Sequence, residues 1–217
     1  MREVEIKAVF FDVGETLINE GRIYDAWADW LGVPRHTFHA VLGGVIARGE
    51  PHMAVFEHFR PGFDLAAEEE ARRAAGVPNG FDERDLYPDA RRCLAALRRH
   101  GYVVGVAGNQ PAEAAARFAA LGLETDLAAM SAEWGVEKPS PAFFARLCQE
   151  AGLPAAEILY VGDRVDNDIV PAAAAGLRTA FLLRGPWAHV QALTPLPTPP
   201  THTLVDLDAL TALLTTP

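Results

Sequence analysis

Four segments, far apart in the chain, contain residues whose types and spacing suit phosphate chemistry. They are Asp12, Gly14 and Thr16 in VFFDVGETL, Gly108 and Asn109 in VAGN, Lys138 in VEKPSPAFF, and Asp163 and Asp168 in GDRVDND. Carboxylates near a lysine could hold Mg²⁺ and a phosphate group, because Mg²⁺ prefers oxygen ligands and often shares them with a substrate phosphate. The lysine would offset the negative charge and attract the phosphate, and the amide of Asn109 could donate to phosphate oxygens.

Buried strands and helices alternate along most of the chain and would position these residues. Strands are predicted at residues 7–12, 102–107, 158–162 and 179–183. Helices are predicted at 88–100, 111–121, 141–151 and 168–175, each followed by a glycine. This alternation predicts parallel βαβ units in a three-layer α/β fold. Because ligands bind beyond the carboxyl ends of parallel strands, the four segments are expected to meet at one edge of the sheet.

Residues 20–85 interrupt this alternation, since they contain helical patterns and no convincing strand. We therefore expect a Rossmann-like core formed by residues 1–19 and 86–217, with a helical domain at 20–85 inserted after the first strand. The aromatic residues of the insert are expected to form its own small core. They are Trp27, Trp30, Phe38, Phe56 and Phe59. Near the C-terminus, the proline-rich stretch 194–201 predicts a loop before a short strand and a closing helix.

The composition excludes several classes of protein. The 217-residue chain carries a formal net charge of −10, whereas a nucleic-acid-binding protein usually presents a basic face. No segment approaches the roughly 18 uninterrupted apolar residues that a membrane span needs. The N-terminal sequence is not that of a signal peptide, and the two cysteines, Cys93 and Cys148, form no disulfide framework. We therefore expect a cytoplasmic protein with no nucleic-acid or membrane partner.

The four segments resemble, in the same order, the four motifs of the haloacid dehalogenase superfamily, and particularly of its phosphatase-like members. FDVGET resembles the first motif, VAGN the second, the lysine of EKPS the third and GDRVDND the fourth. The insert at 20–85 resembles the helical cap that this family places between its first and second motifs. The resemblance covers nearly the whole chain, and it implies a Rossmann-like core and Mg²⁺-dependent phosphoryl transfer through an aspartyl-phosphate.

The resemblance also implies a role for each matching residue. Asp12 would be the nucleophile, and Lys138 would offset its charge. Mg²⁺ would be bound by Asp12, the carbonyl of Gly14 and Asp163, while Asp168 would act through water or orient these ligands. Phosphate would be held by Lys138 with Gly108 and Asn109 at the end of the second strand, and Thr16 would order the first loop. A capped site implies a small soluble phosphate as substrate. Separately from the resemblance, the general frequency of dimers among soluble proteins leaves a monomer or a homodimer open.

Two glycines depart from the pattern of the phosphatases. Gly14 stands where these enzymes usually have a second aspartate, the general acid and base, and Gly108 stands where they have a phosphate-binding serine or threonine. The neighbouring acid Glu15 is not expected to replace the missing one, because adjacent side chains tend to point apart. We therefore predict a Mg²⁺-dependent hydrolase of small phosphate esters with reduced acid–base capability.

Two alternatives remain open from the sequence. The first is a catalytically weak relative that binds a phosphorylated ligand or acts in regulation. The second is a metal-independent 2-haloacid dehalogenase. That class also lacks the second aspartate, but it has a tyrosine there and lacks the metal-binding acids of the fourth motif, so the GDRVDND segment disfavours it.

Overall fold

A six-stranded parallel sheet forms the centre of one of two units in the computed structural model, which describes residues 5–77 and 79–216. This core unit comprises Met1–Asn19 and Leu86–Pro217, and a helical unit comprises Glu20–Asp85. The prediction that no signal peptide is present concerns a segment whose first residues, 1–4, lie outside the described part of the chain.

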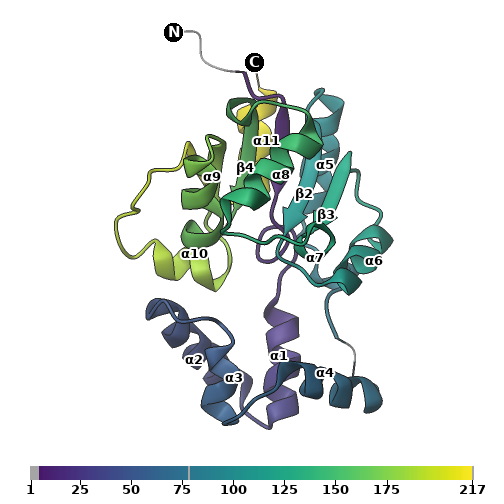
Figure 1. The fold of residues 1–217 in the computed structure, drawn as a ribbon, viewed down its shortest axis with the longest axis vertical. Helices are drawn as coiled ribbons and strands as arrows, with labels where there is room; N and C mark the ends of the chain where they lie inside the picture. Colours follow the sequence, from purple (N-terminus) through teal and green to yellow (C-terminus); the bar gives the residue numbers. More distant parts are fainter. Residues whose placement is uncertain (1–4, 78, 217) are drawn as a thin grey trace. The chain divides into compact units, whose positions relative to one another are not determined.

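The strands of the core unit follow the order β3-β2-β1-β4-β5-β6 (Figure 1). They are β1 (Ala8–Phe11), β2 (Val103–Gly108), β3 (Leu127–Met130), β4 (Ile158–Gly162), β5 (Arg178–Leu182) and β6 (His202–Leu204). All five neighbouring pairs are parallel. The strand order reverses at β1, which lies between β2 and β4, and in folds of this class ligands bind beyond the carboxyl ends of the strands at such a reversal.

Helices pack on both faces of this sheet. Phe10 and Tyr160 form one cluster with Phe143 and Leu147 of α8 (Pro141–Ala151). The helices of the core unit are α5 (Ala90–Arg99), α6 (Ala112–Ala120), α7 (Ser131–Trp134), α8, α9 (Val170–Ala174), α10 (Gly185–Gln191) and α11 (Leu207–Thr215), with short helical turns η2 (Ala155–Glu157) and η3 (Val165–Ile169). α8 contacts α9, and α5 contacts α11 as a separate pair. The predicted Rossmann-like, three-layer α/β class is confirmed.

Three local predictions differ from the structure. The edge strand β3 (Leu127–Met130) was not predicted, because its sequence LAAM is short and rich in alanine, which strands disfavour. The helix predicted at 168–175 is two elements, since the π-helical turn η3 at Val165–Ile169 precedes α9. The short helix α10 follows the last predicted core strand without a sequence prediction of its own.

The helical unit packs around its own aromatic side chains. Its helices are α1 (Gly21–Leu31), α2 (Arg35–Ala47), α3 (Ala54–Phe59) and α4 (Leu65–Ala74), followed by the turn η1 (Glu83–Asp85). Trp27, Phe38 and Phe56 are buried, and the ring centroids of Phe38 and Phe56 lie 5.6 Å apart. Trp30 and Phe59 are half-buried, and the Trp30 indole N–H donates to Glu68 at 2.7 Å. The expected aromatic core is therefore centred on three of the five residues.

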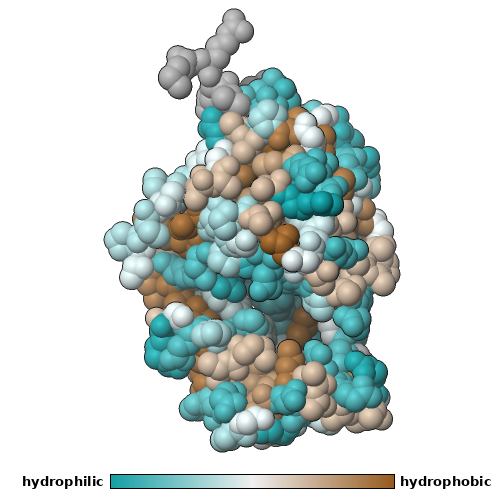
Figure 2. All heavy atoms as spheres, viewed as in Figure 1, coloured by the Kyte–Doolittle hydropathy of each residue, from teal (hydrophilic) through white to brown (hydrophobic). Residues whose placement is uncertain are grey.

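The outer surface mixes residue types. In the view of Figure 2, hydrophobic residues form separate areas between hydrophilic ones, as is ordinary for the water-facing surface of folded domains. Among the described residues, none of the helices is both long enough and apolar enough to span a membrane.

Candidate active site

The site lies where the strand order reverses. Asp12 directly follows β1, and its backbone N–H donates to the carbonyl of Val161 in β4 at 2.9 Å. Asp163 directly follows β4 and is 1% exposed. The apolar strands β1 and β4 thus deliver two carboxylates to one end of the sheet, at the position where ligands bind in folds of this class.

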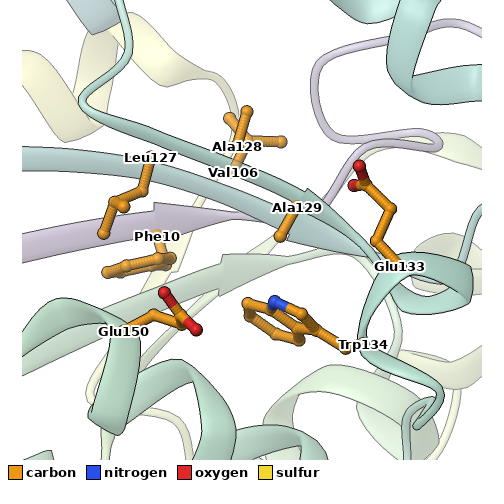
Figure 3. A pocket seen from close by; sticks show the side chains of 8 residues that line it. All are labelled: Phe10, Val106, Leu127, Ala128, Ala129, Glu133, Trp134 and Glu150. Carbon is orange, nitrogen blue, oxygen red and sulfur yellow. The ribbon is translucent and has the colours of Figure 1, made fainter.

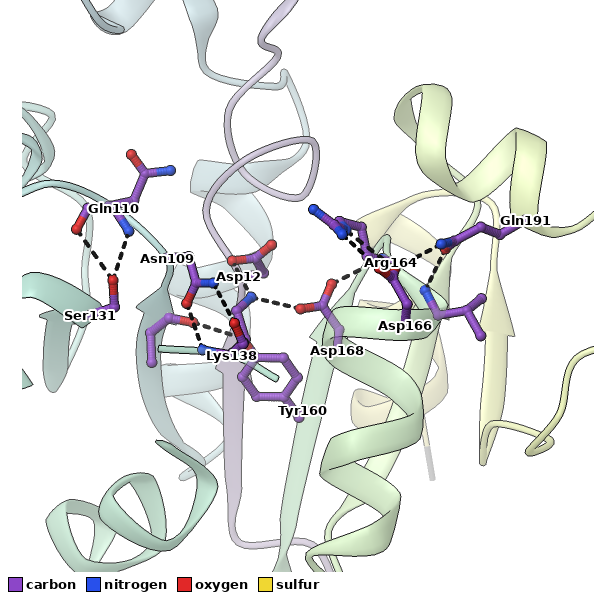
Figure 4. A network of polar contacts seen from close by, with 12 residues as sticks. Asp12, Asn109, Gln110, Ser131, Lys138, Tyr160, Arg164, Asp166, Asp168 and Gln191 are labelled. Atoms are coloured by element: carbon purple, nitrogen blue, oxygen red, sulfur yellow. Dashed lines mark hydrogen bonds and ion pairs between the residues drawn. The ribbon is translucent and has the colours of Figure 1, made fainter. Parts of the chain in front are cut away.

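A buried lysine joins two of the carboxylates. Lys138 Nζ lies 2.7 Å from Asp12 Oδ1 and 2.6 Å from Asp168 Oδ1, and the lysine side chain has no exposed surface (Figure 4). Burial alone would lower the pKa of Lys138, but the charges of Asp12 and Asp168 raise it well above its usual value. The lysine is therefore a fixed positive charge beside Asp12.

The loop that carries Lys138 is held by Asn109. The Asn109 side chain accepts a hydrogen bond from the Lys138 N–H and donates one to the Lys138 carbonyl, both at 2.8 Å. After the lysine, Ser140 caps α8 by accepting a hydrogen bond from Ala142 N–H, and Pro141 occupies the first helical turn. The sequence led us to expect that Asn109 holds phosphate, whereas the contact in the structure is with the backbone of Lys138.

Asp12, Asp163 and Asp168 form the carboxylate cluster of the site. One ligand oxygen from each lies within 4.8 Å of the other two, and all three residues are buried. Three buried carboxylates and one lysine leave an excess of negative charge, which a hard divalent cation with oxygen preference would neutralise. The donor set therefore fits Mg²⁺.

Both carboxylate oxygens of Asp168 are engaged. Oδ1 pairs with Lys138, and Oδ2 accepts the backbone N–H of Arg164 at 2.9 Å. Complete burial raises the pKa of Asp168 to about 6; the nearby Lys138 opposes this shift, and Asp12 reinforces it. These contacts suit a residue that orients Lys138 and the loop after β4.

The raised pKa of Asp168 predicts how its charge affects stability. The pKa is about 6 in the folded protein and 3.8 in the reference state, so between these values the folded protein holds a proton that the unfolded chain releases. This group's contribution to the free energy of unfolding therefore falls as pH rises from 4 through 6. At about 1.4 kcal/mol per pKa unit, the total change is at most about 3 kcal/mol.

Urea unfolding of the metal-free protein and of Asp168→Asn, at pH 4.5 and at pH 7.5, would measure this effect. Asparagine does not titrate, so only the natural protein should lose this contribution as the pH rises. The free energy of unfolding of the natural protein minus that of Asp168→Asn should therefore be smaller at pH 7.5 than at pH 4.5. The same stability difference between the two proteins at both pH values would contradict the raised pKa.

The first loop holds two further predicted residues, Gly14 and Thr16. The two peptides on either side of Gly14 are hydrogen-bonded to Ile18. The Ile18 N–H donates to the carbonyl of Val13, and the Glu15 N–H donates to the carbonyl of Ile18. Thr16 is fully buried, and its carbonyl accepts from Arg184 Nη1 at 3.0 Å. This bond uses the backbone of Thr16, whose buried hydroxyl has no recorded hydrogen-bond partner among the described residues, and its role in ordering the loop stays a prediction.

Gly108 lies against the predicted nucleophile. A Cβ atom at this position would lie 2.6 Å from Asp12 Oδ1 and 3.2 Å from the backbone nitrogen of Val13. A serine or threonine here would require the Asp12 carboxylate to move from its position beside Lys138. The absence of a side chain at Gly108 thus leaves the space that the Asp12 carboxylate occupies in this structure.

One residue beside Lys138, Tyr160, was missed in the sequence. Tyr160, within β4, donates to the carbonyl of Ala107 at 2.7 Å, and its ring centroid lies 5.4 Å from Lys138 Nζ. Its position in an apolar strand gave no sign of this role. Beside the site, Arg164 pairs with Asp166, and its guanidinium carbon lies 5.1 Å from the Trp187 ring centroid.

A pocket of about 190 Å³ lies elsewhere in the core unit (Figure 3). It is lined by Phe10, Val106, Leu127, Ala128, Ala129, Glu133, Trp134 and Glu150. Its two carboxylates already have partners, because Glu133 accepts from the Met130 N–H and Glu150 pairs with Arg146. None of the predicted site residues lines it, so its shape gives no information about the carboxylate cluster.

Comparison with known proteins places this geometry in a family. Residues 6–176 match the model of the haloacid dehalogenase-like hydrolases. A glyceraldehyde 3-phosphate phosphatase of Methanopyrus kandleri is 33% identical over 48% of this chain and 46% of its own, so the matched segment spans about half the length of either protein. A phosphoserine phosphatase of Thermus thermophilus is 28% identical over 79% of this chain and 72% of its own.

A solved structure agrees with the fold. The putative hydrolase YfnB of Bacillus subtilis, determined with bound magnesium, has a TM-score of 0.70 and 18% identity, covering 97% of this chain and 99% of its own. At this identity the likeness concerns the fold alone. The family match over most of the chain shows that the protein belongs to the haloacid dehalogenase-like hydrolases.

Proposed function

We propose that the protein is a Mg²⁺-dependent phosphatase of small phosphate esters, with Asp12 as the nucleophile. The observation that carries this proposal is the buried contact of Lys138 with Asp12, beside Asp163 and Asp168 at the carboxyl ends of β1 and β4. The names of the relatives, which are phosphatases of small phosphorylated metabolites, support the same substrate class.

The residues of the site can perform a two-step displacement. A carboxylate oxygen of Asp12 attacks phosphorus, the bond from phosphorus to the ester oxygen breaks, and an aspartyl-phosphate forms. Water then attacks the same phosphorus, which releases inorganic phosphate and restores Asp12. Lys138, held by Asn109 and Asp168, contacts and orients the Asp12 carboxylate and attracts the phosphoryl oxygens.

The metal would be held by this chain's own oxygens. Asp12, the Gly14 carbonyl and Asp163 would supply ligands, and Asp168 would orient them. When bound, Mg²⁺ neutralises charge on the transferring phosphoryl group. The helical unit Glu20–Asp85 is proposed to be the cap, which would favour small substrates because a closed site excludes bulky ones.

The nature of the leaving group should dominate the rate. With glycine at position 14, the departing oxygen receives no proton from the position that usually supplies one, and general acid catalysis is typically worth about 10²–10⁴-fold. A phenolate leaves readily without a proton, whereas an alkoxide does not. We expect kcat/KM for p-nitrophenyl phosphate, which reports the formation of the aspartyl-phosphate, to exceed kcat/KM for a simple alkyl phosphate by about 10²-fold or more.

Steady-state rates with and without Mg²⁺ would test both the function and this selectivity. Gly14→Asp is the matched variant, and it should narrow the gap between the two substrates. Equal kcat/KM values for both substrates in the natural protein would show that another group supplies the proton. Mg²⁺ binding without turnover of either substrate would favour the second candidate, a phospho-ligand-binding relative, which the loss of the acid at Gly14 supports.

A further inference from the structure

Glu15, which follows Gly14, has an unusual backbone for its residue type. Its φ of 50° lies in the left-handed region, where a side chain beyond glycine is disfavoured by contacts of its Cβ. Among the described residues, it is the one non-glycine residue recorded with a positive φ. Such a conformation persists only when the surrounding structure holds it, and strained residues of this kind cluster at functional sites.

The side chain of Glu15 is held by two residues from other parts of the core unit. Glu15 is 5% exposed, and its Oε2 accepts a hydrogen bond from the Tyr87 hydroxyl at 2.6 Å. Gly185 leaves the space for it, because a Cβ there would lie 2.6 Å from Glu15 Cβ and Cγ and 2.8 Å from Oε2. Gly185 itself has a φ of 70°.

Tyr87 is in turn fixed in place. Its N–H donates to the carbonyl of Leu17 at 2.9 Å, so its backbone is bonded to the same loop that its hydroxyl contacts. The guanidinium carbon of Arg184 lies 4.0 Å from the Tyr87 ring centroid, and Arg184 also pairs with Asp89. Burial, followed by the charge of Glu15, raises the pKa of Tyr87, so the hydroxyl remains a donor at any working pH.

This anchor acts on the peptide that joins Gly14 to Glu15. The Glu15 N–H donates to the Ile18 carbonyl at 2.7 Å. In a planar trans peptide the N–H and C=O point in opposite directions, so the Gly14 carbonyl points away from Ile18. The φ angle of Glu15 is the rotation that relates this peptide to the Cα and side chain of Glu15. Because Tyr87 holds that side chain, the rotation fixes the direction of the peptide and of its Gly14 carbonyl.

We propose that Glu15, held by Tyr87 and by the space at Gly185, is a positioning residue that fixes the direction of the Gly14 carbonyl for Mg²⁺. The proposal rests on the proposed function, in which this carbonyl is a ligand. It gives Glu15 a role other than that of a replacement acid, since its carboxylate is buried against Tyr87. Partners that orient metal ligands typically affect metal affinity by about 10–100-fold.

Isothermal titration of the full chain with MgCl₂, without substrate, tests the proposal. We expect Glu15→Ala to raise the Mg²⁺ Kd by about tenfold or more, because it loses the anchor but keeps the unfavourable φ. Glu15→Gln should stay within about threefold of the natural protein, since its side-chain carbonyl still accepts from Tyr87. Glu124→Ala, which removes an exposed carboxylate at the opposite end of the sheet, controls for the change in net charge.

Tyr87→Phe provides a second variant that removes only the hydroxyl, should Glu15→Ala fail to fold. It should also raise the Kd, and excess Mg²⁺ should restore kcat in both variants. Unchanged Mg²⁺ affinity in Glu15→Ala or Tyr87→Phe, with the natural protein binding the metal, would overturn the inference and leave the proposed function standing. Absence of Mg²⁺ binding by the natural protein would overturn the proposed metal site and this inference with it.

Discussion

Replacing Asp12 with asparagine is expected to lower kcat for p-nitrophenyl phosphate by about 10⁴-fold or more, the scale seen when a catalytic nucleophile is removed. The asparagine amide cannot form the aspartyl-phosphate, and it no longer presents a full negative charge to Lys138. Lys138 keeps its second partner, Asp168, at 2.6 Å, so the variant should fold. Steady-state kinetics with saturating Mg²⁺, beside circular dichroism of both proteins, would measure the loss.

Asp166→Asn is the matched control for this experiment. Asp166 belongs to the same fourth motif, but its carboxylate contacts Arg164 and Gln191 and no residue of the carboxylate cluster that the structure records. It should retain most of the natural kcat. Turnover by Asp12→Asn above about 1% of the natural rate would mean that the nucleophile lies elsewhere.

The sequence was sufficient to predict the framework that places Asp12. Four apolar runs, each ending near polar residues, predicted parallel strands, and four of the six strands of the sheet correspond to them. A fifth, β6, corresponds to the short strand predicted before the closing helix. These predictions succeed because strands buried on both faces carry continuous apolar sequence. The strand β3 escaped detection because hydrogen bonds to β2, rather than its own composition, make it a strand.

The partners within the site were less predictable. The residue types at positions 12, 138, 163 and 168 indicated a charged cluster, but their pairing depends on loops that meet only in the folded chain. Asn109 illustrates this limit, since its amide bonds the backbone of Lys138 across 29 positions of sequence. Glu15 is a second case. The expectation that it does not replace the acid missing at position 14 followed from chain geometry, whereas its hydrogen bond to Tyr87 spans 72 positions and has no sequence signal.

Lys138→Met is expected to be the most destabilising single change in the site. The lysine side chain is fully buried, and its ammonium group contacts Asp12 and Asp168 at 2.7 and 2.6 Å. Methionine fills a similar volume but leaves the buried carboxylates without their positive partner. Removing one member of a buried ion pair typically costs about 3–5 kcal/mol in the free energy of unfolding. Urea unfolding of the metal-free proteins at pH 7.5 would measure this cost.

The charge of the carboxylates, rather than lost packing, should account for most of that cost. Adding Asp168→Asn to Lys138→Met removes one of the uncompensated charges, so the double variant should be more stable than Lys138→Met alone, and a double-mutant cycle gives the coupling. Lowering the pH should also reduce the cost, because the pKa of buried Asp168, which Lys138 lowers, rises once the lysine is gone and protonation then neutralises this carboxylate. Mg²⁺ should raise the stability of Lys138→Met by binding only to the folded state. A cost below about 1 kcal/mol, unchanged by pH, would be typical of solvated ion pairs and would contradict the buried pairing from which the site is built.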